Sequence, residues 1–206
     1  MASNKHKVFI SYHHANDEGY KKALLKLNEL YELFVDASVD TGDIDENLDD
    51  ETIRQKIRDE YLKDSSITIV LVGTETKNRK HIDWEIYSSM FNGSVNKQSG
   101  ILVINLPTTE CTNYTASHGK DEKSIVYPEN NDWFSITTRT EYENRYPYLP
   151  ARIIDNLLNK KAKISVTNWK KVTEDIGKLR FLINATYDDH TQCEYDLSRP
   201  MRKSDS

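Results

Sequence analysis

The sequence predicts an open α/β sheet of parallel strands with helices on both faces. Residues 67–73, ITIVLVG, are uncharged, rich in β-branched side chains and closed by glycine. Such runs are typical of strands covered on both faces, as in parallel sheets. Shorter apolar runs at residues 8–10 and 101–106 also predict strands, with helical patterns between them. Strands that alternate with helices at this spacing form βαβ units with right-handed crossovers.

The first half of the chain carries most of these elements. Apolar side chains at three- and four-residue steps predict a helix over residues 20–34, with Asn16 and Asp17 as candidate N-caps. Residues 34–39 predict a second strand, and an acidic loop follows over residues 40–51. Two more amphipathic helices are expected on either side of the central strand, over residues 53–61 and 82–91.

The second half has a weaker pattern and is expected to be a mainly helical elaboration. Residues 107–150 are polar and rich in tyrosine, with one strand expected at residues 133–137. Helices are expected at residues 151–161 and 169–183, and the apolar stripe of the second is expected to pack on the sheet. The polar tail, residues 198–206, is predicted to be disordered.

Length and composition fit one domain. The chain has 206 residues, of which 37% are hydrophobic and 30% charged. We expect a single domain over residues 1–206, with a recognisable core at residues 8–106 and residues 107–206 as a further part of it. No apolar run approaches the ~20 residues of a membrane span, and no apolar signal-peptide core follows the first methionine. We therefore expect a cytoplasmic protein that does not bind membranes.

Several functional classes are disfavoured by charge and motif content. The net charge of −5 argues against a nucleic-acid surface. Cys111 and Cys193 are too few for a disulfide framework and match no zinc spacing, and the His13-His14 pair lacks further ligands, so no metal is expected. Glycine-rich nucleotide loops and a G-x-S-x-G nucleophile elbow are absent from the sequence.

Candidate binding residues lie where the predicted strands end. Ligands of open parallel sheets bind beyond the carboxyl ends of the strands, near the point where the strand order reverses. The first strand brings Ser11 and Tyr12 to that edge, the second brings Asp36 and Ser38, and the third brings Thr74. Each of them is a candidate substrate-binding residue, although ordinary turn hydrogen bonds or packing would also explain them.

Three segments resemble the TIR-like proteins of bacterial Thoeris antiphage defence: FISYHH at residues 9–14, FVDASV at residues 34–39 and VGTETKNRKHIDWEI at residues 72–86. The resemblance covers about residues 8–106, and its most specific part is the array over residues 76–86. It implies a flavodoxin-like sheet and an enzyme that cleaves the nicotinamide–ribose bond of NAD. NAD is then the substrate, and no resident cofactor is implied.

The resemblance also implies a signalling role. Such enzymes release an ADP-ribose-derived signal, expected here to be cyclic, that activates a separate antiphage effector protein. A phage-derived trigger and self-association of the domain are implied as well. Whether the product is linear, a cyclic isomer or a conjugate stays open.

The resemblance assigns the catalytic role to Glu85. Glycosidases generally need a second carboxyl group to protonate the departing oxygen. Nicotinamide is a cationic pyridinium in NAD and leaves neutral, so one carboxylate that stabilises the oxocarbenium-like ribose is enough. Phe9 lies in the strand-end region that faces nucleotide in TIR enzymes, and Arg79 either meets a diphosphate or extends into solvent. Trp84 either lines the pocket or packs in the core.

Two other functions stay open. Many TIR domains are adaptors that act by domain assembly without catalysis. Nucleoside deoxyribosyltransferase-like enzymes share a flavodoxin-like sheet and a catalytic glutamate but act on nucleosides. The array over residues 76–86 favours the NAD-cleaving enzyme over both.

Overall fold

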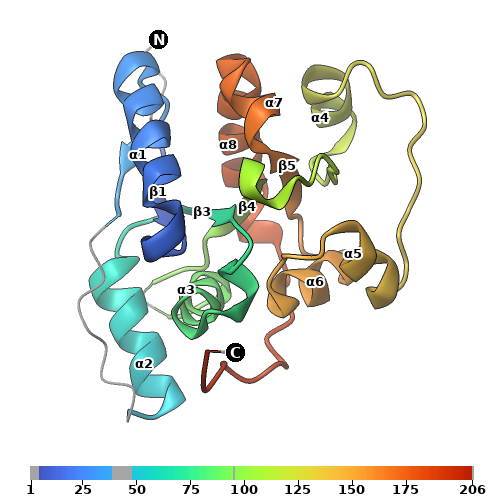
Figure 1. Ribbon diagram of the computed structural model, residues 1–206. Coiled ribbons are helices and arrows are strands. Elements are labelled where there is room, and N and C mark those ends of the chain that lie inside the picture. The colour runs from blue at the N-terminus through green and yellow to red at the C-terminus, as the bar shows by residue number, and fades with distance from the viewer. Residues whose placement is uncertain (1–4, 39–47, 95, 206) are drawn as a thin grey trace.

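Within the described residues 5–38, 48–94 and 96–205 of the computed structural model, five parallel strands form one sheet in the order β2-β1-β3-β4-β5 (Figure 1). The strands are β1 (Lys7–Ser11), β2 (Val35–Asp36), β3 (Ile67–Val72), β4 (Gly100–Asn105) and β5 (Ser165–Asn168). This order is that of flavodoxin-like sheets. The predicted fold class is therefore confirmed.

Helices cover both faces of the sheet. One face packs on α1 (His14–Tyr31), α4 (Gly119–Val126), α7 (Trp169–Thr173) and α8 (Ile176–Asp189). The other packs on α2 (Asp50–Lys56), which continues as one π-helical turn (Ile57–Tyr61), and on α3 (Lys80–Met90), α5 (Arg139–Arg145) and α6 (Ala151–Leu158). Figure 1 shows α3 between α2 and α6 on this second face.

The alternation of side chains along β1 decides which residues meet which helix. Val8 and Ile10 belong to the apolar cluster under α1 and α8. Successive strand residues point to opposite faces, so Phe9 and Ser11 point to the side of α3. Phe9 accordingly belongs to a cluster that includes Trp84 of α3.

The first helix begins earlier than its apolar pattern suggests. α1 starts at His14, and its N-cap is His13, which makes no side-chain cap hydrogen bond. The prediction that Asn16 and Asp17 cap this helix is therefore wrong, because both lie inside its first turn. The strand predicted over residues 34–39 is only two residues long. Residues 40–47 of the acidic loop predicted over residues 40–51 lie outside the described residues.

The second half contains structure that periodicity did not reveal. The strand predicted at residues 133–137 is wrong, because that segment has no regular secondary structure. β5, α4 and α5 were not predicted. The helix expected over residues 169–183 is divided into α7 and α8, where the Asp175 side chain caps the new helix by accepting from Gly177 N–H. Its apolar stripe packs on the sheet, as predicted.

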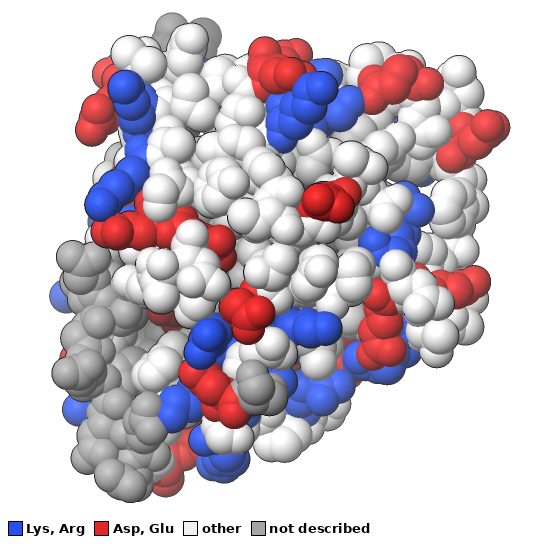
Figure 2. Space-filling view, in the orientation of Figure 1, with Lys and Arg blue, Asp and Glu red and all other residues white. Residues whose placement is uncertain are grey.

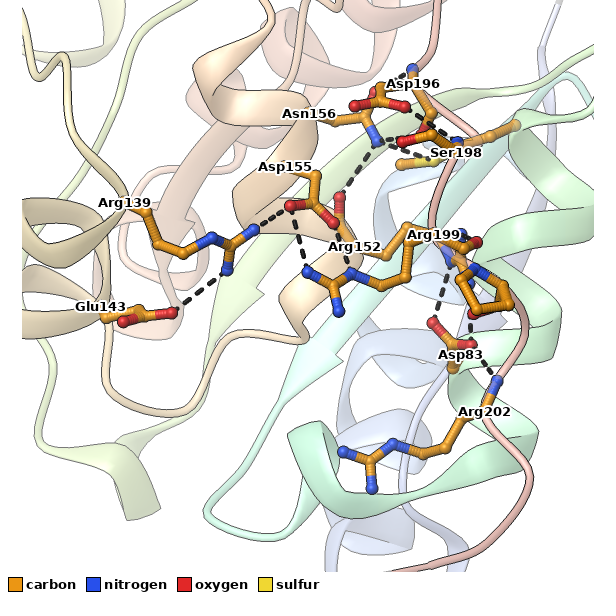
Figure 3. A network of polar contacts seen from close by, with 12 residues as sticks. Asp83, Arg139, Glu143, Arg152, Asp155, Asn156, Asp196, Ser198, Arg199 and Arg202 are labelled. Carbon is orange, nitrogen blue, oxygen red and sulfur yellow. Dashed lines mark hydrogen bonds and ion pairs between the residues drawn. The ribbon is translucent and has the colours of Figure 1, made fainter.

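The prediction that the C-terminal tail is disordered is also wrong, since it lies against α3 (Figure 3). The guanidinium of Arg152, fully buried on α6, donates to both carboxylate oxygens of Asp83 at 2.9 Å. It also donates to the carbonyls of Arg199 and Pro200, while Arg202 N–H donates to Asp83. A buried arginine needs several acceptors, and the tail backbone supplies two of them.

Further contacts extend this attachment along α3. Trp84 Nε1 donates to the Arg202 carbonyl at 2.8 Å, and Met201 is buried in the Phe9–Trp84 cluster. At the start of α3, the Asp205 carboxylate accepts from Lys80 N–H and pairs with Arg79. The tail therefore holds the helix along its N-terminal half.

Charge is dispersed over the surface. On the face shown in Figure 2, acidic and basic side chains are interspersed rather than gathered by sign. In the part of the chain that the structure describes, the helices are too short or too polar to cross a bilayer.

The Asp83–Arg152 pair predicts a large stability effect. We expect Arg152→Ala to lower the free energy of unfolding by about 3–5 kcal/mol, because it leaves the Asp83 charge buried without its partner. Urea unfolding measures the change. Lys26→Ala, at an exposed position of α1, is the control and should change stability by less than about 0.5 kcal/mol. A loss for Arg152→Ala as small as for the control would contradict this account.

Candidate active site

The candidate site lies where the order of the strands reverses. β1 has β2 on one side and β3 on the other, so the carboxyl ends of β1 and β3 form the switch point. Glu85 on α3 reaches this edge, where Ser11 Oγ at the end of β1 donates to its Oε2 at 2.6 Å. The sequence separates the two residues by 74 positions, and the fold joins them.

The position of Glu85 follows from the burial of α3. Glu85 stands two residues after Asp83, whose carboxylate accepts a hydrogen bond from Arg152 of α6. Toward the end of the helix, Ser89 shares a 2.7 Å hydrogen bond with Thr68 of β3. α3 is thus fixed to the sheet and to α6, and the exposed fraction of Glu85 is only 5%.

Burial changes the electrostatics of Glu85. It raises the pKa of this carboxyl to about 7, because desolvation disfavours the charged form. The Ser11 hydrogen bond and the positive charge of Lys21 on α1 lower the pKa, but by less than burial raises it. Near neutral pH the group is therefore divided between its acid and its carboxylate form.

A second buried carboxyl group stands on the opposite side of the same edge. Asp17, in the first turn of α1, is 2% exposed, and burial raises its pKa to about 6. Its Oδ2 has no hydrogen-bond partner among the described residues. Sequence reasoning assigned Asp17 only a capping role. A helix-start aspartate gives no sign that it will be buried, so the pattern held no signal for this site.

Gly73 makes room for Asp17. A Cβ atom at this position, just after β3, would lie 2.4 Å from Asp17 Oδ2, so that the Asp17 side chain would have to move. The glycine that closes the central strand thus leaves the space that the Asp17 carboxylate occupies. Thr76 Oγ1 accepts from Gly73 N–H at 2.8 Å and fixes the turn.

The aromatic candidates lie in the core beside the site. Phe9 and Trp84, 2% and 3% exposed, share one apolar cluster on the α3 side. Tyr12 lies on the α1 side, where its ring stacks on His14 with centroids 4.3 Å apart. Whether Phe9, Tyr12 and Trp84 contact substrate is not tested by this packing and stays a prediction.

The predicted residues of β2 hold the strand ends together. Ser38 Oγ accepts from Ile10 N–H at 3.1 Å, and the Asp36 carboxylate accepts from Ser38 N–H at 2.9 Å. Thr74 is half-buried in the turn after β3. The described contacts do not bring any of the three to Glu85, in contrast to Ser11.

Arg79 is positioned for an anion. It is the N-cap residue of α3, and its Nη1 lies 3.0 Å from Oδ2 of Asp205. The tail carboxylate of Asp205 thus pairs with the arginine for which the sequence left open a diphosphate contact or extension into solvent, and the diphosphate contact stays a prediction. Among the described residues, no group of three His, Cys, Asp or Glu side chains gathers as metal ligands would.

Comparison with known proteins identifies the family of the chain. Residues 9–111, half of the chain, match the family model described as Thoeris protein ThsB, TIR-like domain. The chain belongs to this family. The ThsB match spans β1 to β4 and contains Ser11, Asp17 and Glu85, while β5 and the tail lie beyond it. Membership assigns the chain to the Thoeris antiphage defence system. No curated protein matches the sequence significantly.

The raised pKa of Glu85 predicts how stability depends on pH. The folded-state pKa of about 7 exceeds the ordinary value of 4.5, so the folded protein holds this proton more tightly than the unfolded chain. The resulting stabilisation is complete below pH 4.5 and is lost as pH rises to about 7. We expect Glu85→Gln to weaken this decline and to be more stable than the wild type at pH 8.

Urea unfolding between pH 4.5 and 8 measures this effect. Glu60→Gln, at an exposed position, is the control and should keep the wild-type profile. Asp17 contributes a decline of the same sign up to about pH 6, which should persist in both variants. An unchanged profile in Glu85→Gln would show that Glu85 titrates as an ordinary carboxyl group.

Proposed function

We propose that this protein cleaves the bond between nicotinamide and ribose in NAD, with Glu85 as the catalytic carboxylate. One observation carries the proposal. A single buried glutamate, fixed by a helix that is itself buried, meets the end of β1 at the switch point of the sheet. Ligands of open α/β sheets bind at this place. Membership in the ThsB TIR-like family supports it.

The chemistry suits one carboxylate. When the bond to C1′ of the ribose breaks, both electrons leave with the ring, and the cationic pyridinium becomes neutral nicotinamide. The ribose then carries positive charge, which a preorganised carboxylate in a low-dielectric site stabilises strongly. Water adds at C1′ and releases a proton, which gives ADP-ribose. If a nucleophilic atom of the adenosine part adds instead, the product is cyclic.

The raised pKa of Glu85 is compatible with this role. A buried carboxyl group without substrate is partly protonated near pH 7. The positive charge of the nicotinamide ring would favour the carboxylate when NAD binds, because a nearby opposite charge lowers the pKa of an acid. The charged form would thus be produced where the substrate needs it, and Ser11 would orient it.

The product is the proposed signal. An ADP-ribose derivative, cyclic in the form we favour, would activate a separate effector of the Thoeris system. The protein would then act at a distance from its effector, through a diffusible molecule. A phage component would provide the trigger.

Removal of the Glu85 charge should abolish catalysis. We expect Glu85→Gln to lower nicotinamide release about 10²–10³-fold, the usual loss when one preorganised electrostatic contact is removed. The amide keeps the shape of the side chain, so the fold should remain intact. Glu60→Gln is the control and should keep full activity. Signal production and protection of infected cells by Glu85→Gln at wild-type levels would contradict the proposal.

The isolated protein should be nearly inactive at low concentration. Glu85 is buried and hydrogen bonded to Ser11, so a ribose can reach it only after local rearrangement. We expect nicotinamide release per molecule to rise with protein concentration or on addition of a phage lysate. Progress curves over a hundredfold range of protein concentration measure this. Constant, rapid turnover by the dilute protein would contradict the gating.

An adaptor role is the second candidate function, and one observation favours it. Leu30 and Tyr31, at the end of α1, are 67% and 49% exposed, and Val35 on the edge strand β2 is 44% exposed. Exposed apolar side chains beside a sheet edge favour association between domains. If the protein acts as an adaptor, Leu30→Lys should abolish the protection of infected cells and Glu85→Gln should leave it unchanged.

A further inference from the structure

A cavity of about 570 Å³ lies on the β5 side of the molecule, in the half of the chain beyond the family match. Its walls come from residues 112–117, residues 130–136 and residues 157–163. The chain that joins α4 to α5, drawn in yellow at the right of Figure 1, includes the second of these walls. The volume of the cavity falls within the 300–1,000 Å³ usual for small-molecule sites.

The walls of this accessory cavity are attached to the sheet. Thr115 and Val166 of β5 exchange two backbone hydrogen bonds of 2.9 Å, so residues 112–117 extend the sheet past its last strand. The Thr115 hydroxyl also bonds to the Tyr146 hydroxyl at 2.7 Å. The cavity is therefore built on fixed elements.

Basic side chains outnumber acidic ones around the cavity, although the chain as a whole is acidic. The lining contains Lys123, Arg145, Lys160 and Lys163, with Asp132 as its acidic residue. Lys163 pairs with Asp189 outside the lining, at 2.7 Å. In the described part of the chain, the other three cations make no ion pair with a carboxylate.

Two hydrogen bonds to uncharged acceptors orient the Arg145 guanidinium in the cavity wall. Its Nη2 donates to the Tyr114 carbonyl at 3.2 Å, and its Nε donates to the Tyr146 hydroxyl at 3.4 Å. These neutral acceptors orient the group without neutralising its charge. Arginine held in this way suits phosphate oxygens.

Aromatic rings provide the second half of the site. Tyr114 stacks on Tyr127 with centroids 3.9 Å apart, and Trp133 packs edge-on against both. Phe134, the next residue, is 70% exposed, and the Arg145 guanidinium lies over its ring, 5.2 Å from the centroid. A flat ring open to solvent beside a cation can stack on a base while phosphate meets the charge.

The accessory cavity is separate from the Glu85 site. The two share no residue, and β5 stands three positions along the sheet from β1. That is about 14 Å, given the usual spacing of neighbouring strands. A ligand in this cavity would therefore be a different molecule from an NAD bound at Glu85.

We propose that the accessory cavity binds a nucleotide, with its phosphates on Arg145 and Lys160 and its base against Trp133 and Phe134. Asp132 stands in the lining to accept hydrogen bonds from ribose hydroxyls. The cavity gives the second half of the chain a ligand site of its own, independent of whether Glu85 cleaves NAD.

Calorimetric titration of the full chain with ADP tests this proposal. ADP has a base and a diphosphate but no nicotinamide bond to cleave. We expect saturable binding that weakens at least about tenfold in the double variant Lys160→Ala/Phe134→Ala, as expected for loss of a charge-assisted contact and a stacking contact. Both side chains are exposed, so the variant should fold normally.

Two controls locate the binding. Lys161→Ala removes the neighbouring lysine, which pairs with Glu194 instead of lining the cavity, and Lys26→Ala changes an exposed position of α1 that belongs to neither site. Both should bind ADP as the wild type does. No binding at millimolar ADP, unchanged binding in the Lys160→Ala/Phe134→Ala variant, or equal affinity for inorganic diphosphate would each overturn the proposal.

Discussion

The buried ion pair between Asp83 and Arg152 is the interaction on which the rest of the structure depends. Two charges removed from water are tolerated only when both are paired and hydrogen bonded. The tail backbone completes the set by offering the carbonyls of Arg199 and Pro200 to Arg152 and an N–H to Asp83. α3, α6 and the C-terminal tail thus meet at one pair of side chains, and Glu85 lies on the helix that this pair helps to fix.

The site that results places two carboxyl groups in low-dielectric surroundings on opposite sides of one sheet edge. Glu85 lies on the α3 side and Asp17 on the α1 side, against Gly73. Each has a pKa raised by burial, which means that each makes the fold less stable at neutral pH than at acid pH. Natural sites often retain such a cost where a charge must act on a substrate. The two groups are unequal, because Glu85 has a hydrogen-bond donor in Ser11 while Asp17 Oδ2 has none among the described residues.

The sequence revealed the parts of the fold that rest on local pattern. Residues 67–73 are uncharged and rich in β-branched side chains, so β3 and its parallel neighbours were predictable, and the array over residues 76–86 pointed to the family. β5 was not predicted, because it is four residues long and has polar side chains that are buried only in the folded sheet. The tail was wrongly predicted to be disordered for a similar reason. Its sequence is polar, yet its backbone carbonyls are acceptors for an arginine 47 residues earlier in the chain. The burial of Asp17 could not be predicted, because it depends on contact with Gly73 and no sequence periodicity indicates that contact.

The central claim is that Glu85 faces the ribose whose bond to nicotinamide is broken. A crystal structure of the Glu85→Gln variant with NAD bound tests this most directly, because the variant should retain substrate. The account predicts that the substituted side chain has left Ser11 and lies within hydrogen-bond distance of the hydroxyls of the nicotinamide ribose, at the carboxyl ends of β1 and β3. NAD bound elsewhere, with the side chain at position 85 still buried against Ser11, would contradict it.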